Sequence, residues 1–126
     1  MSGSQSVAGL RAHWPAELLI HTPAQPLRLE SGDALPSPSI GYQTWGKLNS
    51  ERDNVVWICH ALSGSSDAAQ WWSGLLGRGK AIDPECHFIV CANVLGGCYG
   101  SLGPQSLAAN GQPYGGAFPA ITIGDM

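Results

Sequence analysis

Charge is scarce in this sequence. Asp, Glu, Lys and Arg make up 12% of the 126 residues, about half the usual share. The formal net charge is -3, and the six Lys and Arg residues form no cluster. A surface that binds nucleic acid or an anionic membrane carries such a cluster. The composition therefore gives no indication of a nucleic-acid partner.

Long apolar runs are also missing. The unbroken apolar stretches are far shorter than the roughly 20 residues that span a bilayer. Residues 1–6 are polar and lack the charged start and apolar segment of a secretory signal. We therefore expect a cytoplasmic protein without a membrane partner.

No C-x-x-C spacing is present among the four cysteines, which are Cys59, Cys86, Cys91 and Cys98. The pairs Cys59-His60 and Cys86-His87 contain zinc-ligand types. Adjacent residues of a strand point to opposite faces, however, and do not easily share one ion. Cys59 and Cys91 fall in predicted buried strands, where a free cysteine acts as a small apolar side chain. We expect no metal site.

What the sequence does contain is a short apolar run that ends in a loop. Val55–Cys59 is preceded by polar residues and followed by a Ser-Gly turn. A run of this length predicts a strand buried on both faces. In an open α/β sheet, ligands bind where such strands end, because backbone N–H groups there are not used in strand pairing. Leu62, Ser63 and Gly64 are therefore the first candidate site.

Three further strands are predicted. Residues 25–30 and 39–45 are expected to form a hairpin across residues 31–33, whose Ser-Gly-Asp sequence favours a turn. Residues 87–91 predict a second buried strand. The expected fold class is α/β.

The domain organisation predicted from this pattern is an amino-terminal arm, residues 1–24, followed by a partial α/β domain, residues 25–126. Thr122–Asp125 has the [ST]-x-x-[DE] form of a helix start, and yet the sequence ends at Met126. We therefore expect that part of the domain is missing.

Aromatic and glycine-rich segments follow the candidate loop. One of the adjacent Trp71 and Trp72 is expected to pack inward while the other lines a cavity or covers a loop, although simple packing of both fits equally well. Residues 93–118 contain seven glycines, which indicate backbone packed closely against its surroundings. This segment lacks the Lys and the helix of a phosphate-binding loop.

Ser101 lies in that segment but does not fit a nucleophile elbow. The elbow pattern, G-x-S-x-G, needs a small residue two positions before the serine and another two positions after it. Gly103 satisfies the later position and Tyr99 fails the earlier one. We predict that Ser101 is a loop residue bonded to backbone.

Several motifs, taken in order, resemble one family. They are His60-Ala61-Leu62-Ser63-Gly64, Trp71-Trp72, Gly79-Lys80-Ala81-Ile82-Asp83, Asn93-Val94-Leu95-Gly96-Gly97-Cys98, Gly100-Ser101-Leu102-Gly103-Pro104, Gly111-Gln112-Pro113-Tyr114 and Phe118-Pro119 with Thr122-Ile123. From about Leu29 onward the chain is similar to the amino-terminal part of the homoserine O-acetyltransferases, which are acyltransferases with an α/β-hydrolase fold.

The resemblance implies an activity in methionine biosynthesis. Acetyl-CoA, the co-substrate, and L-homoserine would give O-acetyl-L-homoserine and CoA by a ping-pong route, with no bound cofactor. A serine nucleophile, a histidine base and an aspartate follow one another in that order in this fold. All three are expected beyond Met126, so the fold is expected to stop before the nucleophile elbow and the 126-residue chain to be inactive by itself. Family members are expected to be homodimers.

The resemblance also assigns roles in the candidate loop. The fold takes one oxyanion-hole N–H from the loop after a sheet strand, which corresponds here to the backbone of Leu62. Ser63 and Gly64 are candidates for substrate binding by position. His60 is expected to brace the loop with a side-chain hydrogen bond, because the catalytic histidine should follow the serine.

Three alternatives remain open. A homoserine O-succinyltransferase would resemble this chain closely, although the short connection before Trp71 favours acetyl transfer. A non-catalytic truncated fragment agrees with the expected lack of a triad. An esterase of the same fold would account for fewer of the motifs.

Overall fold

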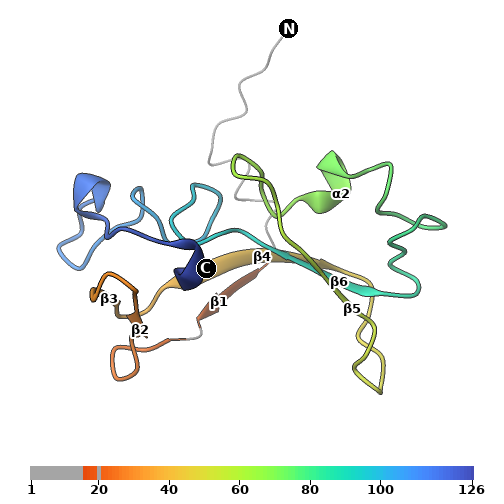
Figure 1. Cartoon of the computed structure of the whole chain (residues 1–126), viewed down its shortest axis with the longest axis horizontal. Coiled ribbons are helices and arrows are strands. Elements are labelled where there is room, and N and C mark those ends of the chain that lie inside the picture. Colours follow the sequence, from red (N-terminus) through yellow and green to blue (C-terminus); the bar gives the residue numbers. More distant parts are fainter. Residues whose placement is uncertain (1–15, 20) are drawn as a thin grey trace, which may run out of the picture. The chain divides into compact units, whose positions relative to one another are not determined.

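A computed structural model describes residues 16–19 and 21–126 (Figure 1). Most of the predicted arm, residues 1–24, lies outside the described residues. The elements are β1 (Ala16–Leu19), β2 (Leu27–Arg28), β3 (Ala34–Leu35), β4 (Ser39–Trp45), β5 (Val55–Ile58), α2 (Ala68–Trp71), β6 (Phe88–Ala92) and the 3-10 helices η1 (Gly115–Ala117) and η2 (Ile123–Asp125). The chain divides into two compact units. The first unit is Met1–Gly41 with Asn93–Met126, and the second unit is Tyr42–Ala92.

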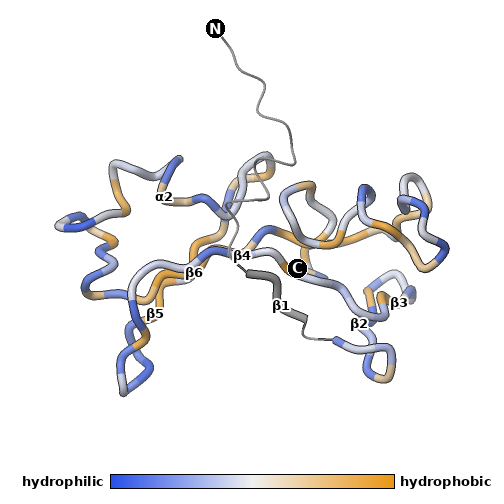
Figure 2. The backbone as a smooth tube through the Cα atoms, turned by 180° about the vertical axis from the view of Figure 1, so that it is seen from behind, coloured by the Kyte–Doolittle hydropathy of each residue, from blue (hydrophilic) through white to orange (hydrophobic). Residues whose placement is uncertain are grey.

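A four-stranded mixed sheet has the strand order β1-β4-β6-β5. In the second unit β4 runs antiparallel to β6, with Tyr42 opposite Ala92. β5 runs parallel to β6, with Val55 opposite Phe88. A parallel pair needs a crossover of a dozen or more residues, and the segment that contains the candidate loop and α2 provides it. Figure 2 shows hydrophobic stretches along β5 and β6.

The strand β5 forms where the apolar run predicted it, but only one of its faces is buried. Ile58 is 3% exposed, whereas Val55 is 47% and Trp57 is 61% exposed. The prediction of burial on both faces is therefore wrong for the described residues. β5 ends the strand order and its side chains alternate, so one face alone meets the core. Cys59 follows the strand end and is exposed, which also corrects its predicted burial.

The core of the second unit packs between the sheet and the segment that follows the candidate loop. Its buried members are Ile58, Ala68, Leu76, Ile89 and Cys91. Burial raises the pKa of the Cys91 thiol to about 11, so this cysteine is a neutral apolar group at physiological pH. Ala68 is the first residue of α2, and its packing holds the far end of the candidate loop against the sheet.

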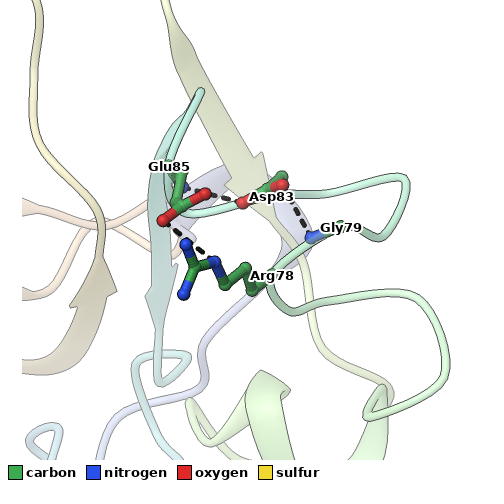
Figure 3. Close-up of polar contacts among 4 residues, drawn as sticks. All are labelled: Arg78, Gly79, Asp83 and Glu85. Carbon is green, nitrogen blue, oxygen red and sulfur yellow. Dashed lines mark hydrogen bonds and ion pairs between the residues drawn. The ribbon is translucent and has the colours of Figure 1, made fainter.

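One carboxylate closes the loop that leads into β6 (Figure 3). Asp83 accepts hydrogen bonds from the N–H groups of Gly79 (2.7 Å) and Glu85 (2.8 Å). These donors lower the pKa of the Asp83 carboxyl. Arg78 and Glu85 form an ion pair at 3.1 Å, but both side chains are largely exposed. A surface pair of this kind adds little stability. The hydrogen bonds accepted by Asp83 are therefore the main polar contacts that hold the loop.

The first unit contains a hairpin with a different partner from the predicted one. β2 pairs with β3, with Leu27 opposite Leu35, so the predicted pairing of residues 25–30 with 39–45 is wrong. The Leu29 N–H donates to the Asp33 carbonyl at 2.9 Å, and Gly32 has a φ of 93°. Because the chain reverses tightly here, β3 lies beside β2 and residues 39–45 do not.

Backbone in the glycine-rich segment is closely packed at Gly97 and Gly103, as predicted, but a Cβ atom on Gly111, Gly115 or Gly116 would meet nothing within 4 Å. A Cβ atom built on Gly103 would lie 2.3 Å from the Gly97 carbonyl oxygen, and one on Gly41 would lie 3.1 Å from the Gly100 carbonyl carbon. Buried Leu29, Leu35 and Leu95 form the core of the first unit. A side chain at Gly103 or Gly41 would therefore push the backbone away from its neighbours.

The predicted capping box at Thr122 is present. Asp125 accepts from the Thr122 N–H at 2.9 Å, and its other oxygen accepts from the Glu30 N–H at 2.9 Å. The element it begins, η2, is a single 3-10 turn. None of the helices in the described part of the chain is long and apolar enough to cross a membrane.

Candidate functional site

The candidate loop, residues 59–67, runs from the end of β5 to the start of α2 (Figure 1). The strand stops at Ile58, so the backbone beyond it is free of strand pairing, as the sequence predicted. All of the loop belongs to the second unit. The structure thus brings Leu62, Ser63 and Gly64 together in one turn after a parallel strand.

The turn is closed by a hydrogen bond from the Gly64 N–H to the Ala61 carbonyl, at 2.7 Å. Leu62 and Ser63 occupy its two central positions. Neither residue has a positive φ, which excludes turns of types II, I′ and II′ and fits type I. Leu62 is therefore at the position where a φ near -60° is required.

The N–H of Leu62 is unused. None of the described residues accepts a hydrogen bond from it. The Leu62 side chain is 100% exposed, so it does not cover the amide by packing into the loop. A backbone donor that faces away from the protein's own acceptors is free to bind an oxygen atom of another molecule.

His60 braces the loop as predicted. Its Nδ1 atom lies 2.7 Å from the Ala61 carbonyl oxygen. Because a carbonyl only accepts, Nδ1 carries the proton in this contact. The ring thus holds the first peptide of the turn.

Ser63 and Gly64 differ in how the loop uses them. Ser63 is exposed. Gly64 is half-buried, and a Cβ atom on it would lie 3.1 Å from the Ala61 oxygen and 3.2 Å from the His60 Cβ. Gly64 therefore has a packing role in the turn. The predicted substrate contacts of both residues stay predictions.

Trp71 holds the other end of the loop. Its indole Nε1–H donates to the Ser65 carbonyl at 2.9 Å. The Trp71 and Trp72 rings contact each other at 5.1 Å between centroids and are 37% and 41% exposed. The expectation that one ring packs inward is wrong, because Trp71, the last residue of α2, and Trp72, its C-cap, are both more than a third exposed. The sequence signal for this hydrogen bond was an indole N–H donor six residues after Ser65.

Ser101 is buried and bonded to backbone, as predicted. Its Oγ accepts from the Gly41 N–H at 3.0 Å and donates to the Asn93 carbonyl. The hydroxyl proton is already given to a carbonyl, and no base contacts the hydroxyl. This geometry is that of a structural serine.

Metal binding receives no support from the described side chains. Across residues 21–126, no three His, Cys, Asp or Glu residues lie close enough to hold an ion together.

Comparison with known proteins gives close relatives. No family model matches the chain. It is 55% identical over 107 residues to a homoserine O-acetyltransferase of Trichormus variabilis, covering 84% of this chain and 30% of the relative. With the homoserine O-acetyltransferase of Chlorobium chlorochromatii it shares 50% identity over 111 residues, covering 87% of this chain and 31% of the relative. The chain thus spans about a third of the length of these relatives.

Solved structures agree with these relatives in fold. The homoserine O-acetyltransferase from Bacillus anthracis has a TM-score of 0.74 at 32% identity, covering 87% of this chain and 33% of that one. Esterase E22 has a TM-score of 0.72 at 28% identity, covering 87% of this chain and 34% of that one. The fold is that of the α/β hydrolases, as the sequence predicted.

Proposed function

We propose that this chain, which is homologous to homoserine O-acetyltransferases over most of its length, is part of an enzyme that acetylates L-homoserine. Acetyl-CoA is the acetyl donor, and O-acetyl-L-homoserine and CoA are the products. The scheme needs no resident cofactor. A cytoplasmic location and a homodimeric state stay predictions from the resemblance.

The observation that carries the proposal is the unused N–H of Leu62 in a turn directly after a parallel strand. Acyl transfer forms a tetrahedral intermediate with a negative oxygen, and α/β hydrolases stabilise it with two backbone N–H groups. We propose that Leu62 supplies one of them. The other comes from the residue after the nucleophile, outside these 126 residues.

The reaction proceeds in two matched halves. The serine oxygen attacks the thioester carbonyl while the catalytic histidine takes the serine proton, and the C–S bond then breaks as the histidine passes this proton to the departing sulfur of CoA. The homoserine hydroxyl then attacks the acetyl-serine and gives its proton to the same histidine. The ester bond to the serine breaks as O-acetylhomoserine forms, and the histidine returns the proton to the serine oxygen. Leu62 donates to the carbonyl oxygen in both halves.

We propose that Ser101 is not the triad serine. Both hydrogen bonds of the Ser101 hydroxyl are with backbone groups. The 126-residue chain is therefore expected to show no turnover with acetyl-CoA and homoserine. Measurable turnover would contradict this assignment.

A second candidate function is hydrolysis of acetyl esters. An acetylester hydrolase from Corynebacterium glutamicum has a TM-score of 0.72 with this chain at 28% identity. The oxyanion contact is common to both activities, and only the acyl acceptor differs, water or homoserine. Product analysis with acetyl-CoA in the presence and absence of homoserine distinguishes the two, and succinyl-CoA in place of acetyl-CoA tests the succinyltransferase alternative.

The test replaces the amide in the complete polypeptide that contains these residues. Leu62→Pro removes the N–H, and Leu62 holds the turn position at which proline is favoured, so the turn should persist. We expect kcat to fall about 100- to 1000-fold. Leu62→Ala is the matched control, which keeps the N–H and removes an exposed side chain. Equal rates for the proline variant and the wild type would refute the proposal.

A further inference from the structure

The carbonyl of Ala61 accepts two hydrogen bonds, from the Nδ1–H of His60 and the N–H of Gly64, both at 2.7 Å. A carbonyl oxygen has two lone pairs, so its capacity is filled. The two donors come from opposite ends of the turn, one side chain and one backbone group. Together they fix the direction of the carbonyl.

The direction of this carbonyl determines that of the Leu62 amide. The peptide unit between Ala61 and Leu62 is planar and trans. In such a unit the C=O and the following N–H point in opposite directions. Whatever holds the Ala61 oxygen toward the loop therefore aims the Leu62 N–H away from it.

The packing around Gly64 supports the same arrangement. The space that a Cβ atom would need is bounded by the Ala61 oxygen at 3.1 Å and the His60 Cβ at 3.2 Å. The histidine, the carbonyl and the glycine are thus in mutual contact. Only a residue without a side chain lets both donors reach one oxygen without displacement.

We propose that His60 is a positioning residue of the oxyanion hole, which holds the Ala61 carbonyl and through the planar peptide aims the Leu62 N–H at the thioester oxygen. This role rests on the proposed acyl transfer. His60 does not touch the substrate and exchanges no proton with it. Without the ring, one hydrogen bond remains on the carbonyl and the peptide plane is free to tilt.

The two ring nitrogens allow a specific test. Nδ1 is bonded directly to Cγ, as is the amide nitrogen of asparagine. Glutamine places its amide one bond further out, near the position of Nε2. His60→Asn therefore keeps a donor for the Ala61 carbonyl, whereas His60→Gln and His60→Leu do not.

The variants are assayed in the complete polypeptide with acetyl-CoA and homoserine. We expect His60→Leu and His60→Gln to lower kcat about 10- to 100-fold, less than the loss of the donor itself. His60→Asn should stay within about threefold of wild type, and the KM for acetyl-CoA should change little in all three, because a positioning role acts on the transition state. Thermal unfolding of each variant checks that it is folded.

A double-variant cycle separates positioning from a general structural role. When Leu62→Pro has removed the amide, there is nothing left to aim, so adding His60→Leu should lower kcat no further. Independent, multiplied losses would overturn the inference. So would wild-type kcat in His60→Leu, or no advantage of asparagine over glutamine.

Failure of the proposed function has a different signature. A wild-type enzyme that makes no O-acetylhomoserine overturns that function. The same variants assayed on 4-nitrophenyl acetate still test His60, since ester hydrolysis uses the same oxyanion contact.

Discussion

Replacing Ser101 with alanine should cost stability and spare catalysis. Ser101 is 5% exposed, and its hydroxyl is hydrogen-bonded to two backbone groups. The substitution removes this hydroxyl. It leaves the buried Gly41 N–H without its acceptor, at a cost of about 1–3 kcal/mol, and it removes the bond to the Asn93 carbonyl, worth about 1 kcal/mol. We therefore expect a loss of about 2–4 kcal/mol in the free energy of unfolding.

The assay combines urea unfolding with steady-state kinetics on the complete polypeptide, the kinetics being measured well below the unfolding temperature. Ser106→Ala is the matched control, because its Oγ also accepts from a backbone N–H, that of Gly103 at 3.0 Å, but is half-buried. Water can replace that contact, so the loss should stay below about 1 kcal/mol.

The kinetic result decides whether Ser101 is a nucleophile. Loss of a nucleophilic serine abolishes acyl transfer and leaves the fold intact, whereas loss of a structural serine weakens the fold and leaves kcat nearly unchanged. An unfolding free energy within 0.5 kcal/mol of wild type, about the scatter of surface substitutions, together with a kcat reduced a thousandfold or so, would refute the structural assignment.

Two further predictions concern the first unit. Gly103→Ala should destabilise by about 1–3 kcal/mol or more, since its Cβ would lie 2.3 Å from a backbone oxygen. Gly116→Ala, which meets no atom within 4 Å, should be nearly neutral in the same urea titration. The N–H groups of Thr122 and Glu30 lower the pKa of Asp125, so its contribution is present above the unfolded-state pKa of about 3.9 and is lost as pH falls through the lower folded pKa. The difference in urea midpoint between wild type and Asp125→Asn should therefore shrink from pH 6 to pH 2.5, and a constant difference would contradict this linkage.

The strands of the second unit could be predicted because local pattern determines them. Residues 87–91 were expected as a strand and β6 is Phe88–Ala92. Alternation and apolar content are properties of the segment itself. Which faces are covered is a property of the whole sheet, and this is why Val55 and Trp57 are exposed against expectation.

The hairpin partner could not be read from strand propensity. β3 has only two residues, Ala34 and Leu35, which is too short to give a periodic signal. The better signal was the turn itself. With the Leu29 N–H bonded to the Asp33 carbonyl, the chain reverses within a few residues, and the next residues must pair first.

The family could be predicted from ordered motifs, and the candidate site only partly. Order and spacing of motifs were sufficient to indicate a resemblance to homoserine O-acetyltransferases, and relatives of that name at 50% and 55% identity confirm the resemblance. His60 as a loop brace followed from its chemistry. The Trp71 bond to Ser65 and the unused state of the Leu62 amide depend on three-dimensional geometry, because every loop residue except proline has an N–H.

The geometry of the loop places different chemical demands on its residues. In the proposed function only the backbone of residue 62 acts, and its side chain is fully exposed, so the turn itself does not require leucine. The proposal needs a donor attached directly to Cγ at position 60, and a Cβ atom at position 64 would crowd the Ala61 oxygen that both neighbours share. A backbone oxyanion donor is therefore better identified from the residues that fix its peptide plane than from the residue that carries it. In this chain those residues are His60 and Gly64.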